Sequence, residues 1–254
     1  MTSDELKKAL LAAFVIGTLA AGEASGQGGP PMITDDPGTP GNGKWENNLA
    51  IGFEHRPNEW SIAAPAIDLN YGWGDHIQLT LQTSVALLKR SDHGLIGGLG
   101  GTEAAVKWRF LDQEQSGIDM SMFPRVLFNI LQSSVRRGLS EDGTRFQIPF
   151  QAAKKFGPID LDVEFGPLIS SVEGSEFIYG IVGGVDLSKT TAVMAEVHAT
   201  SRTNFSRDVV TVNLGWRHAL SKRAIWIGSL GHEVHSGAGD PLAFIGYCGV
   251  QLLF

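Results

Sequence analysis

The chain has 254 residues, 32 of them glycine, with a formal net charge of −7 at pH 7 and a mean hydropathy of +0.01. This acidity argues against a nucleic-acid partner, because proteins that bind nucleic acids normally present a basic face. The single cysteine, Cys248, permits no disulfide within the chain. After residue 24 there is no run of about eighteen apolar residues, which excludes a helical membrane protein.

The first 24 residues have the order of a secretory signal peptide. Lys7 and Lys8 precede an apolar run at residues 9–21, and small residues including Ala24 follow it. The run is too short to cross a bilayer as a helix. We therefore predict a signal peptide at residues 1–24 and an irregular N-terminal periplasmic segment at residues 25–43, which is rich in Gly, Pro and Asp. The sequence leaves open whether this segment lies free or is tucked into the mouth of the following domain.

From residue 44 onward the chain divides into about twelve segments in which apolar and polar residues alternate. A period of two places the two kinds of side chain on opposite faces of a strand. Pro124 and Pro149 fall inside two of the segments, where the missing N–H predicts a bulge or irregular pairing. The segments are residues 45–53, 66–71, 77–87, 104–110, 118–130, 146–152, 159–165, 177–187, 192–200, 210–216, 224–230 and 244–254.

The connections between these segments alternate in length. Short turns are expected at residues 72–75, 112–116, 154–158, 188–190 and 219–222, and mostly longer loops at residues 55–65, 89–101, 131–143, 170–175, 201–207 and 232–241. Short periplasmic turns and long outer loops are typical of outer-membrane barrels. We therefore predict an all-β fold, a transmembrane antiparallel up-and-down β-barrel of about twelve strands at residues 44–254, embedded in the lipids of a Gram-negative bacterial outer membrane.

The aromatic residues also indicate an outer-membrane location. Phe254 follows an amphipathic strand, and a terminal aromatic on such a strand is what outer-membrane barrels present to their assembly machinery. We therefore predict that Phe254 is an assembly signal and that this machinery is a partner of the chain. The aromatic residues near the proposed strand ends predict an interfacial girdle; they are Trp45, Trp73, Trp108, Phe110, Trp216 and Phe254.

Several segments resemble a known family. They are NYGWGDHIQL at residues 70–79, GLGGTEAAVKWRF at residues 98–110, the strand containing Phe123-Pro124, and residues 228–254 with Asp240-Pro241 before the last strand. Over roughly residues 30–254 the chain is similar to the outer-membrane transporters named after the "MetA-pathway of phenol degradation". The resemblance implies a barrel, often encoded near aromatic catabolism genes, that passes or binds small and often hydrophobic molecules. It implies no catalytic residues, and the loop at residues 131–143 matches none of the family's patterns.

The alternation also predicts which charged residues face the lumen. Basic residues gather on one wall, together with Glu103 and Asp119, and acidic residues gather on the opposite wall. This pattern has two interpretations: a paired network that fills the lumen, or a constriction with a transverse field that orients polar solutes. The predicted lumen-lining residues are Lys107, Arg109, Arg125 and Arg145 on the basic wall, and Asp160, Asp162, Glu164, Asp186, Glu196 and His198 on the acidic wall.

Three function classes are compatible with this sequence. A channel or transporter for small, hydrophobic or aromatic solutes, without enzymatic activity or cofactor, is favoured over a lipid-modifying hydrolase and over a structural barrel. The hydrolase would use His198 with a serine such as Ser201 and an acid, but the sequence does not reproduce the required order. His232 and His235 are three residues apart rather than the four of a metalloprotease helix, so no metal site is predicted.

Overall fold

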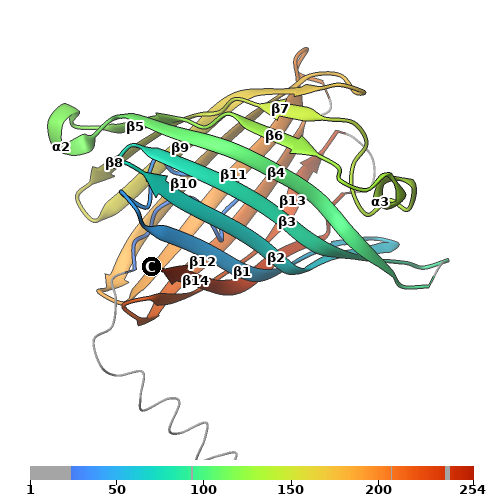
Figure 1. The fold of residues 1–254 in the computed structure, drawn as a ribbon, viewed down its shortest axis with the longest axis horizontal. Helices are drawn as coiled ribbons and strands as arrows, with labels where there is room; N and C mark the ends of the chain where they lie inside the picture. The colour runs from blue at the N-terminus through green and yellow to red at the C-terminus, as the bar shows by residue number, and fades with distance from the viewer. Residues whose placement is uncertain (1–23, 93, 207, 238–240) are drawn as a thin grey trace, which may run out of the picture.

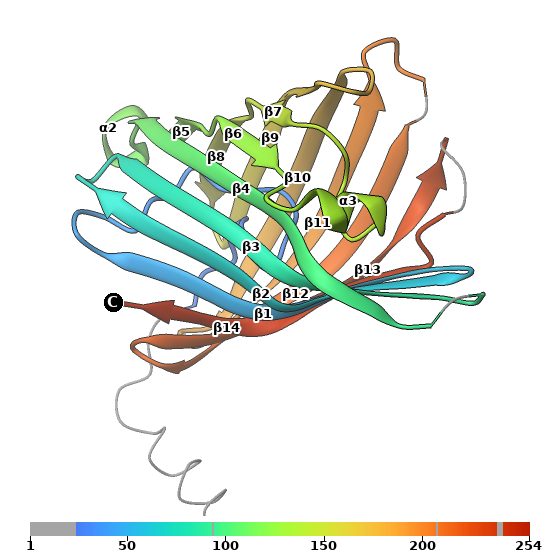
Figure 2. The same ribbon diagram turned by 45° about the vertical axis from the view of Figure 1, so that its right-hand side comes forward.

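A computed structural model of the chain describes residues 24–92, 94–206, 208–237 and 241–254. They form a closed antiparallel β-barrel of twelve strands (Figures 1 and 2), which confirms the predicted fold class. Residues 1–23 of the predicted signal peptide lie outside the described residues. Within the described ranges, no helix is long and apolar enough to cross a membrane.

The barrel wall consists of fourteen strand segments in the described residues. Two of the twelve strands are interrupted, β5 continuing into β6 and β7 into β8, at the Phe123-Pro124 and Ile148-Pro149 pairs. These interruptions lie at the two prolines for which irregular pairing was predicted. The segments are β1 (Trp45–Arg56), β2 (Glu59–Trp73), β3 (Ile77–Arg90), β4 (Ile96–Leu111), β5 (Asp119–Met122), β6 (Arg125–Phe128), β7 (Arg145–Gln147), β8 (Phe150–Phe156), β9 (Ile159–Ser170), β10 (Glu176–Ser188), β11 (Thr191–Arg202), β12 (Val209–Ser221), β13 (Ala224–Ser236) and β14 (Phe244–Leu253).

The ring closes where β1 pairs with β14 from Glu46↔Leu253 to His55↔Phe244. At the end of this seam, Trp45 and Phe254 each donate their N–H to the other's carbonyl oxygen, both at 3.0 Å. The closure leaves no open sheet edge between the first and last strands. An edge of that kind would expose backbone N–H and C=O groups that lipid cannot satisfy.

Two short helices lie at opposite ends of the barrel. Figure 1 places α2 (Gln113–Ser116) at the same end as the carboxyl terminus, and α3 (Gln132–Arg136) at the other end. We call these the α2 end and the α3 end. The turns at the α2 end are short, as predicted: residues 157–158, 189–190 and 222–223 separate their strands.

Three of the predicted outer loops are wrong in their extent, and one of them is the loop predicted at residues 232–241, because β13 continues to Ser236. β1 and β2 remain paired as far as Arg56↔Glu59, so residues 57–58 alone form the turn predicted at residues 55–65. Pro65 does not interrupt β2. It lies at a register shift between Ala63 and Ala66, where its missing N–H breaks no ladder hydrogen bond. Likewise β4 begins at Ile96, inside the loop predicted at residues 89–101.

The outward face of the barrel is apolar. Its side chains alternate with buried polar side chains along each strand, as the period of two requires. A continuous exposed apolar surface of this kind indicates contact with lipid rather than water. Exposed apolar residues at mid-strand positions include Leu49, Ile51, Leu81, Val106, Phe165, Ile181, Val197, Leu214 and Leu230.

The aromatic residues near the strand ends are also outward. Trp45, Trp73, Trp108, Phe110 and Phe254 are exposed, whereas Trp216 is half-buried against Trp226 at 5.4 Å between ring centroids. This arrangement is typical of an interfacial girdle. Cys248 is exposed on the same outer face.

Residues 24–43, which we call the inner loop, run inside the barrel (Figure 2, blue). The loop starts at the α2 end, where the Ala24 N–H donates to the carbonyl of Lys189 at 3.1 Å. It reverses direction at residues 29–34, where Gly29 donates to the carbonyl of Thr34 at 2.8 Å. It then returns to the α2 end, where Gly43 donates to the carbonyl of Gly72 at 2.9 Å.

Candidate functional site

The acidic wall of the barrel holds the backbone of the inner loop. Inward carboxylates of β9, β10 and β11 accept hydrogen bonds from backbone N–H groups of the loop, which has no secondary structure to satisfy them. Four of the predicted acidic residues therefore contact the loop backbone, and one of them, Glu164, also pairs with Arg125 of the basic wall. The bonds are Gly26 to Asp186 at 3.1 Å, Gly28 to Asp162 at 2.9 Å, Ile33 and Thr34 to Glu196 at 3.2 and 2.5 Å, and Asp35 to Glu164 at 2.9 Å.

The opposite side of the loop is held by donors from β12 and β13. Arg217 donates through Nη2 to the carbonyls of Gly28 and Pro30 at 2.7 and 2.8 Å, and Ser229 donates to the carbonyl of Pro31 at 2.8 Å. The side chain of Met32 at the loop's tip packs against Val182 in a small buried apolar cluster. Donors, acceptors and an apolar contact thus fix the loop from several strands.

Glycines in the wall provide the space for the loop. A Cβ atom on Gly184 would overlap the carbonyl oxygen of Gly26, and one on Gly180 would overlap the hydroxyl of Thr34. Gly183, the outward neighbour of Gly184, has nothing within 4 Å of a Cβ position. The inward glycines of β10 therefore permit a close backbone approach that other residues would prevent.

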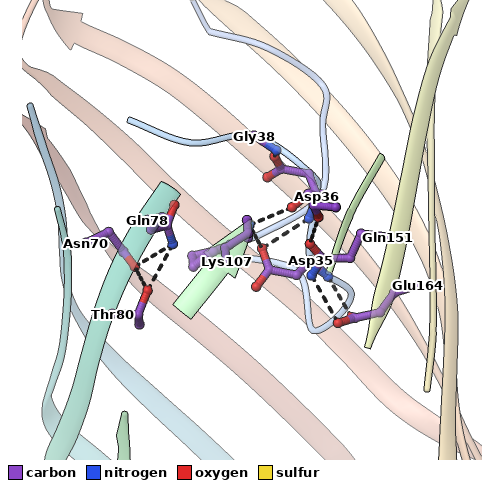
Figure 3. A network of polar contacts seen from close by, with 12 residues as sticks. Asp35, Asp36, Gly38, Asn70, Gln78, Thr80, Lys107, Gln151 and Glu164 are labelled. Carbon is purple, nitrogen blue, oxygen red and sulfur yellow. Dashed lines mark hydrogen bonds and ion pairs between the residues drawn. The ribbon is translucent and has the colours of Figure 1, made fainter. Parts of the chain in front are cut away.

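A cluster of four charged side chains lies where the returning loop passes β4 and β6. Both oxygens of the Asp35 carboxylate are engaged: Oδ1 lies 3.1 Å from Lys107 Nζ, and Oδ2 lies 2.9 Å from Arg125 Nη2. The same Arg125 nitrogen lies 3.1 Å from Oε1 of Glu164. Figure 3 shows Lys107 reaching the inner loop, where it also donates to the carbonyl of Asp36 at 2.6 Å.

An aromatic ring supports the two cations of this cluster. Phe123, at the break between β5 and β6, is only 1% exposed, and its ring lies 4.6 Å from Lys107 Nζ and 4.2 Å from the guanidinium carbon of Arg125. Burial by itself raises the pKa of a carboxyl group, but the charges of Lys107 and Arg125 hold the pKa of Asp35 below its ordinary value. Burial raises the pKa of the neighbouring Asp36. The two cations therefore favour the ionised form of Asp35.

Other residues of the predicted lumen set lie outside this cluster. Arg109 pairs with Asp112 at 2.9 Å near the α2 end, and Asp160 pairs with Lys155 at 3.1 Å at the same end. Arg145 pairs with Glu141 near the α3 end. The predicted walls are thus divided along the barrel axis, because charges at the strand ends find local partners before they can reach across the lumen.

The hydrolase and metal alternatives receive no support from the contacts. Ser201 donates to the carboxylate of Asp208 rather than to His198, which lies on the inward face two residues from Glu196. Glu233 accepts a hydrogen bond from the N–H of Leu242 at 2.9 Å. Among the described residues, no group of three or more His, Cys, Asp or Glu side chains is arranged to hold a metal ion; Asp240 lies outside them.

Sequence reasoning missed three participants: Asp35, Asp36 and Arg217. The inner loop lacks periodicity, so alternation carries no information about where its acids point. Arg217 does follow the alternation of β12, two positions after Gly215 and four after Asn213, and this pattern was sufficient to place it inward.

Three cavities follow one another along the barrel interior. A cavity of about 440 Å³, the outer vestibule, opens at the α3 end and is lined by Arg145, Tyr247, Asp35 and Arg125 among others. A neck of about 80 Å³ shares Asp35 with it and is also lined by Lys107 and Arg217. A cavity of about 240 Å³ at the α2 end, the inner vestibule, shares Asp36 with the neck.

A polar ladder lines the other side of the neck. The amide of Gln78 donates to Oδ1 of Asn70 at 2.8 Å, and the hydroxyl of Thr80 donates to the same oxygen at 2.6 Å (Figure 3). Asn70 and Gln78 both border the neck. Neutral hydrogen-bonding groups thus face the charged cluster.

Comparison with solved structures shows a shared fold. The chain is similar to the COG4313 outer membrane channel from Pseudomonas putida F1, with a TM-score of 0.66 and 10% identity over 84% of this chain and 96% of that one. The barrel has the fold of outer-membrane channels. It is also similar to the NanC porin, with a TM-score of 0.61 and 8% identity over 81% and 98% of the two chains, and to the KdgM porin in complex with disordered oligogalacturonate, with a TM-score of 0.54 and 10% identity over 82% and 99%. No family model and no curated protein matches the sequence.

Proposed function

We propose that the protein is an outer-membrane channel. Small molecules cross it through the barrel, alongside the inner loop. The observation that carries this proposal is the succession of outer vestibule, neck and inner vestibule, each sharing lining residues with the next. A barrel that served only as a scaffold has no need of water-sized space on both sides of a charged neck. The fold shared with outer-membrane channels supports the same function.

The lengths of the connections between strands indicate which end of the barrel faces the periplasm. The short turns and the carboxyl terminus lie at the α2 end, which we assign to the periplasm, and the connection that carries α3 faces outward. The apolar outer face and the exposed aromatic residues at strand ends match the lipid core and interface of an outer membrane. Residues 1–24 act as the secretory signal in this proposal; cleavage after Ala24 removes its contact with Lys189 and leaves the rest of the inner loop, residues 25–43, in the barrel.

Small amphipathic molecules are the solutes that fit best. The outer vestibule combines apolar side chains, including Met32, Leu127 and Phe128, with hydroxyl, amide and charged groups. Its volume lies within the range of about 300–1,000 Å³ that is usual for small-molecule sites. The sequence resemblance to the MetA-pathway family also favours hydrophobic or aromatic solutes.

A structural barrel without transport is the second candidate. One observation favours it: the inner loop and the ion pairs of Lys107 and Arg125 occupy the middle of the lumen. This corresponds to the paired-network interpretation of the inward charges. The two functions differ in solute flux, which can be measured directly.

The experiment is a liposome-swelling assay with purified, folded protein and solutes of graded size and polarity. A channel is expected to give swelling rates above those of protein-free liposomes for solutes near the size of a single aromatic ring, and to exclude much larger ones. Heat-denatured protein provides the control. Rates equal to those of empty liposomes for every solute would favour the structural barrel.

A further inference from the structure

The two cations beside the neck come from the barrel wall, and Lys107 also donates to the inner-loop carbonyl of Asp36 at 2.6 Å. Lys107 comes from β4 and Arg125 from β6, and both lie over the ring of Phe123, which is buried in the same wall. Glu164 of β9 holds Arg125 from the far side at 3.1 Å. The pair is therefore expected to keep its place whether or not Asp35 is there.

Asp35 engages this pair in the manner of a bound carboxylate. Each of its oxygens contacts a different cation, at 3.1 and 2.9 Å, and its side chain forms part of the floor of the outer vestibule. Arg125 also borders the outer vestibule, so a molecule in that cavity lies next to the same guanidinium. The Asp35 side chain thus stands between the cations and the cavity.

Arg125 retains binding capacity that Asp35 does not use. Among the described residues its Nε is buried and has no hydrogen-bond partner, while Nη2 serves both Asp35 and Glu164. A guanidinium binds a carboxylate most strongly through two parallel N–H groups. A carboxylate that replaced Asp35 would have both Nε and Nη2 as donors once the Arg125 side chain exposed Nε.

We propose that Lys107 and Arg125 form a carboxylate-binding site in the solute path, which Asp35 occupies in this structure and for which small carboxylic acids with an apolar body compete. The inference rests on the proposed channel function for its physiological role. The apolar body would lie against Met32, Ile33 and Leu127 in the outer vestibule. A benzoate-like monocarboxylate is the simplest ligand of this class.

The exchange keeps one carboxylate in contact with the two cations. Glu103 and Asp68 also line the outer vestibule, and the displaced Asp35 carboxylate stays nearby, so these negative charges weaken the binding of a solute carboxylate to the wild-type protein. Only the Asp35 side chain has to turn away, because its backbone N–H stays bound to Glu164 at 2.9 Å. Displacement of the whole inner loop is not required.

The test measures binding to the full-length, detergent-folded protein by titration calorimetry. The probes are benzoate, benzylamine and benzyl alcohol, which share a ring and differ in charge. In the Asp35→Asn variant, benzoate should bind about tenfold more tightly than in the wild-type protein, because two charge-assisted contacts become available. Benzyl alcohol should change little, and benzylamine should not gain affinity.

Two further variants separate a specific site from a general charge effect. Asp36→Asn makes the same substitution at the adjacent loop residue, whose side chain is not paired with Arg125, and should raise benzoate affinity much less than Asp35→Asn. Adding Lys107→Met to Asp35→Asn should abolish the gain. A gel shift between unboiled and boiled samples verifies that each variant is folded.

The outcomes also separate this inference from the proposed function. Equal gains for Asp35→Asn and Asp36→Asn, or no benzoate binding by folded Asp35→Asn protein, would overturn the carboxylate site even if solutes still pass. The protein could instead bind benzoate tightly and through Lys107 but give no liposome swelling. That result would support the carboxylate site and overturn the proposed channel function.

Discussion

At the scale of single residues, Gly184 determines whether the inner loop can dock, whereas its outward neighbour Gly183 does not. We expect Gly184→Ala to loosen the loop, because the added methyl group would overlap Gly26 at a cost of about 1–3 kcal/mol, typical of overpacking. Limited proteolysis of folded protein should then cleave within residues 24–43 faster than in the wild type. Gly183→Ala, where the methyl group faces open space, is the matched control. Equal cleavage of both variants would show that this close approach does not hold the loop.

Prediction from sequence succeeded for residues whose position depends on local periodicity. Alternation placed Lys107, Glu164 and Glu196 inward, because successive side chains of a strand must point to opposite faces. It did not identify Asp35, the partner of Lys107 and Glu164, which comes from a loop without periodicity and lies 72 residues from Lys107 in the chain. Nor did it show that Arg109 and Arg145 find local partners, since strand-end contacts depend on the neighbouring turns.

At the scale of elements, the seam between β1 and β14 is the last pairing needed to close the barrel. Phe254 contributes two backbone hydrogen bonds to Trp45, and its side chain is 60% exposed on the outer surface. We propose that this exposed ring is what the assembly machinery recognises. Phe254→Asp should therefore lower the amount of folded barrel in the outer membrane while secretion continues, as measured by heat-modifiable protein in membrane fractions. Phe254→Tyr, which keeps the ring, should restore the yield.

That prediction would fail if Phe254→Asp gave as much folded protein in cells as the wild type.

The strands themselves were predictable because each one carries its own alternation, and Pro124 and Pro149 marked the two breaks. The turn at residues 57–58 was not, because Pro65 suggests a loop unless the register shift that accommodates it is known. The connection predicted as a loop at residues 131–143 contains α3, which no pattern in the sequence indicated.

At the scale of the whole molecule, the barrel and the inner loop are two separable parts. Strand pairing supplies the backbone hydrogen bonds of the wall, whereas side chains hold most of the loop within it. A variant lacking residues 27–37 should therefore still fold, because its strands keep their partners. Circular dichroism of the purified variant should show the β-type spectrum of the wild type, and its gel mobility should still change on boiling. Loss of either property would mean that the loop is part of the folding core.

The central claim is that solutes cross the barrel alongside the inner loop, and conductance across a planar lipid bilayer tests it most directly. The wild-type protein should give discrete conductance steps, and the variant lacking residues 27–37 should give steps severalfold larger, because the loop narrows the lumen between the two vestibules. The account would be contradicted if neither protein gave conductance above that of protein-free lipid, although both were folded.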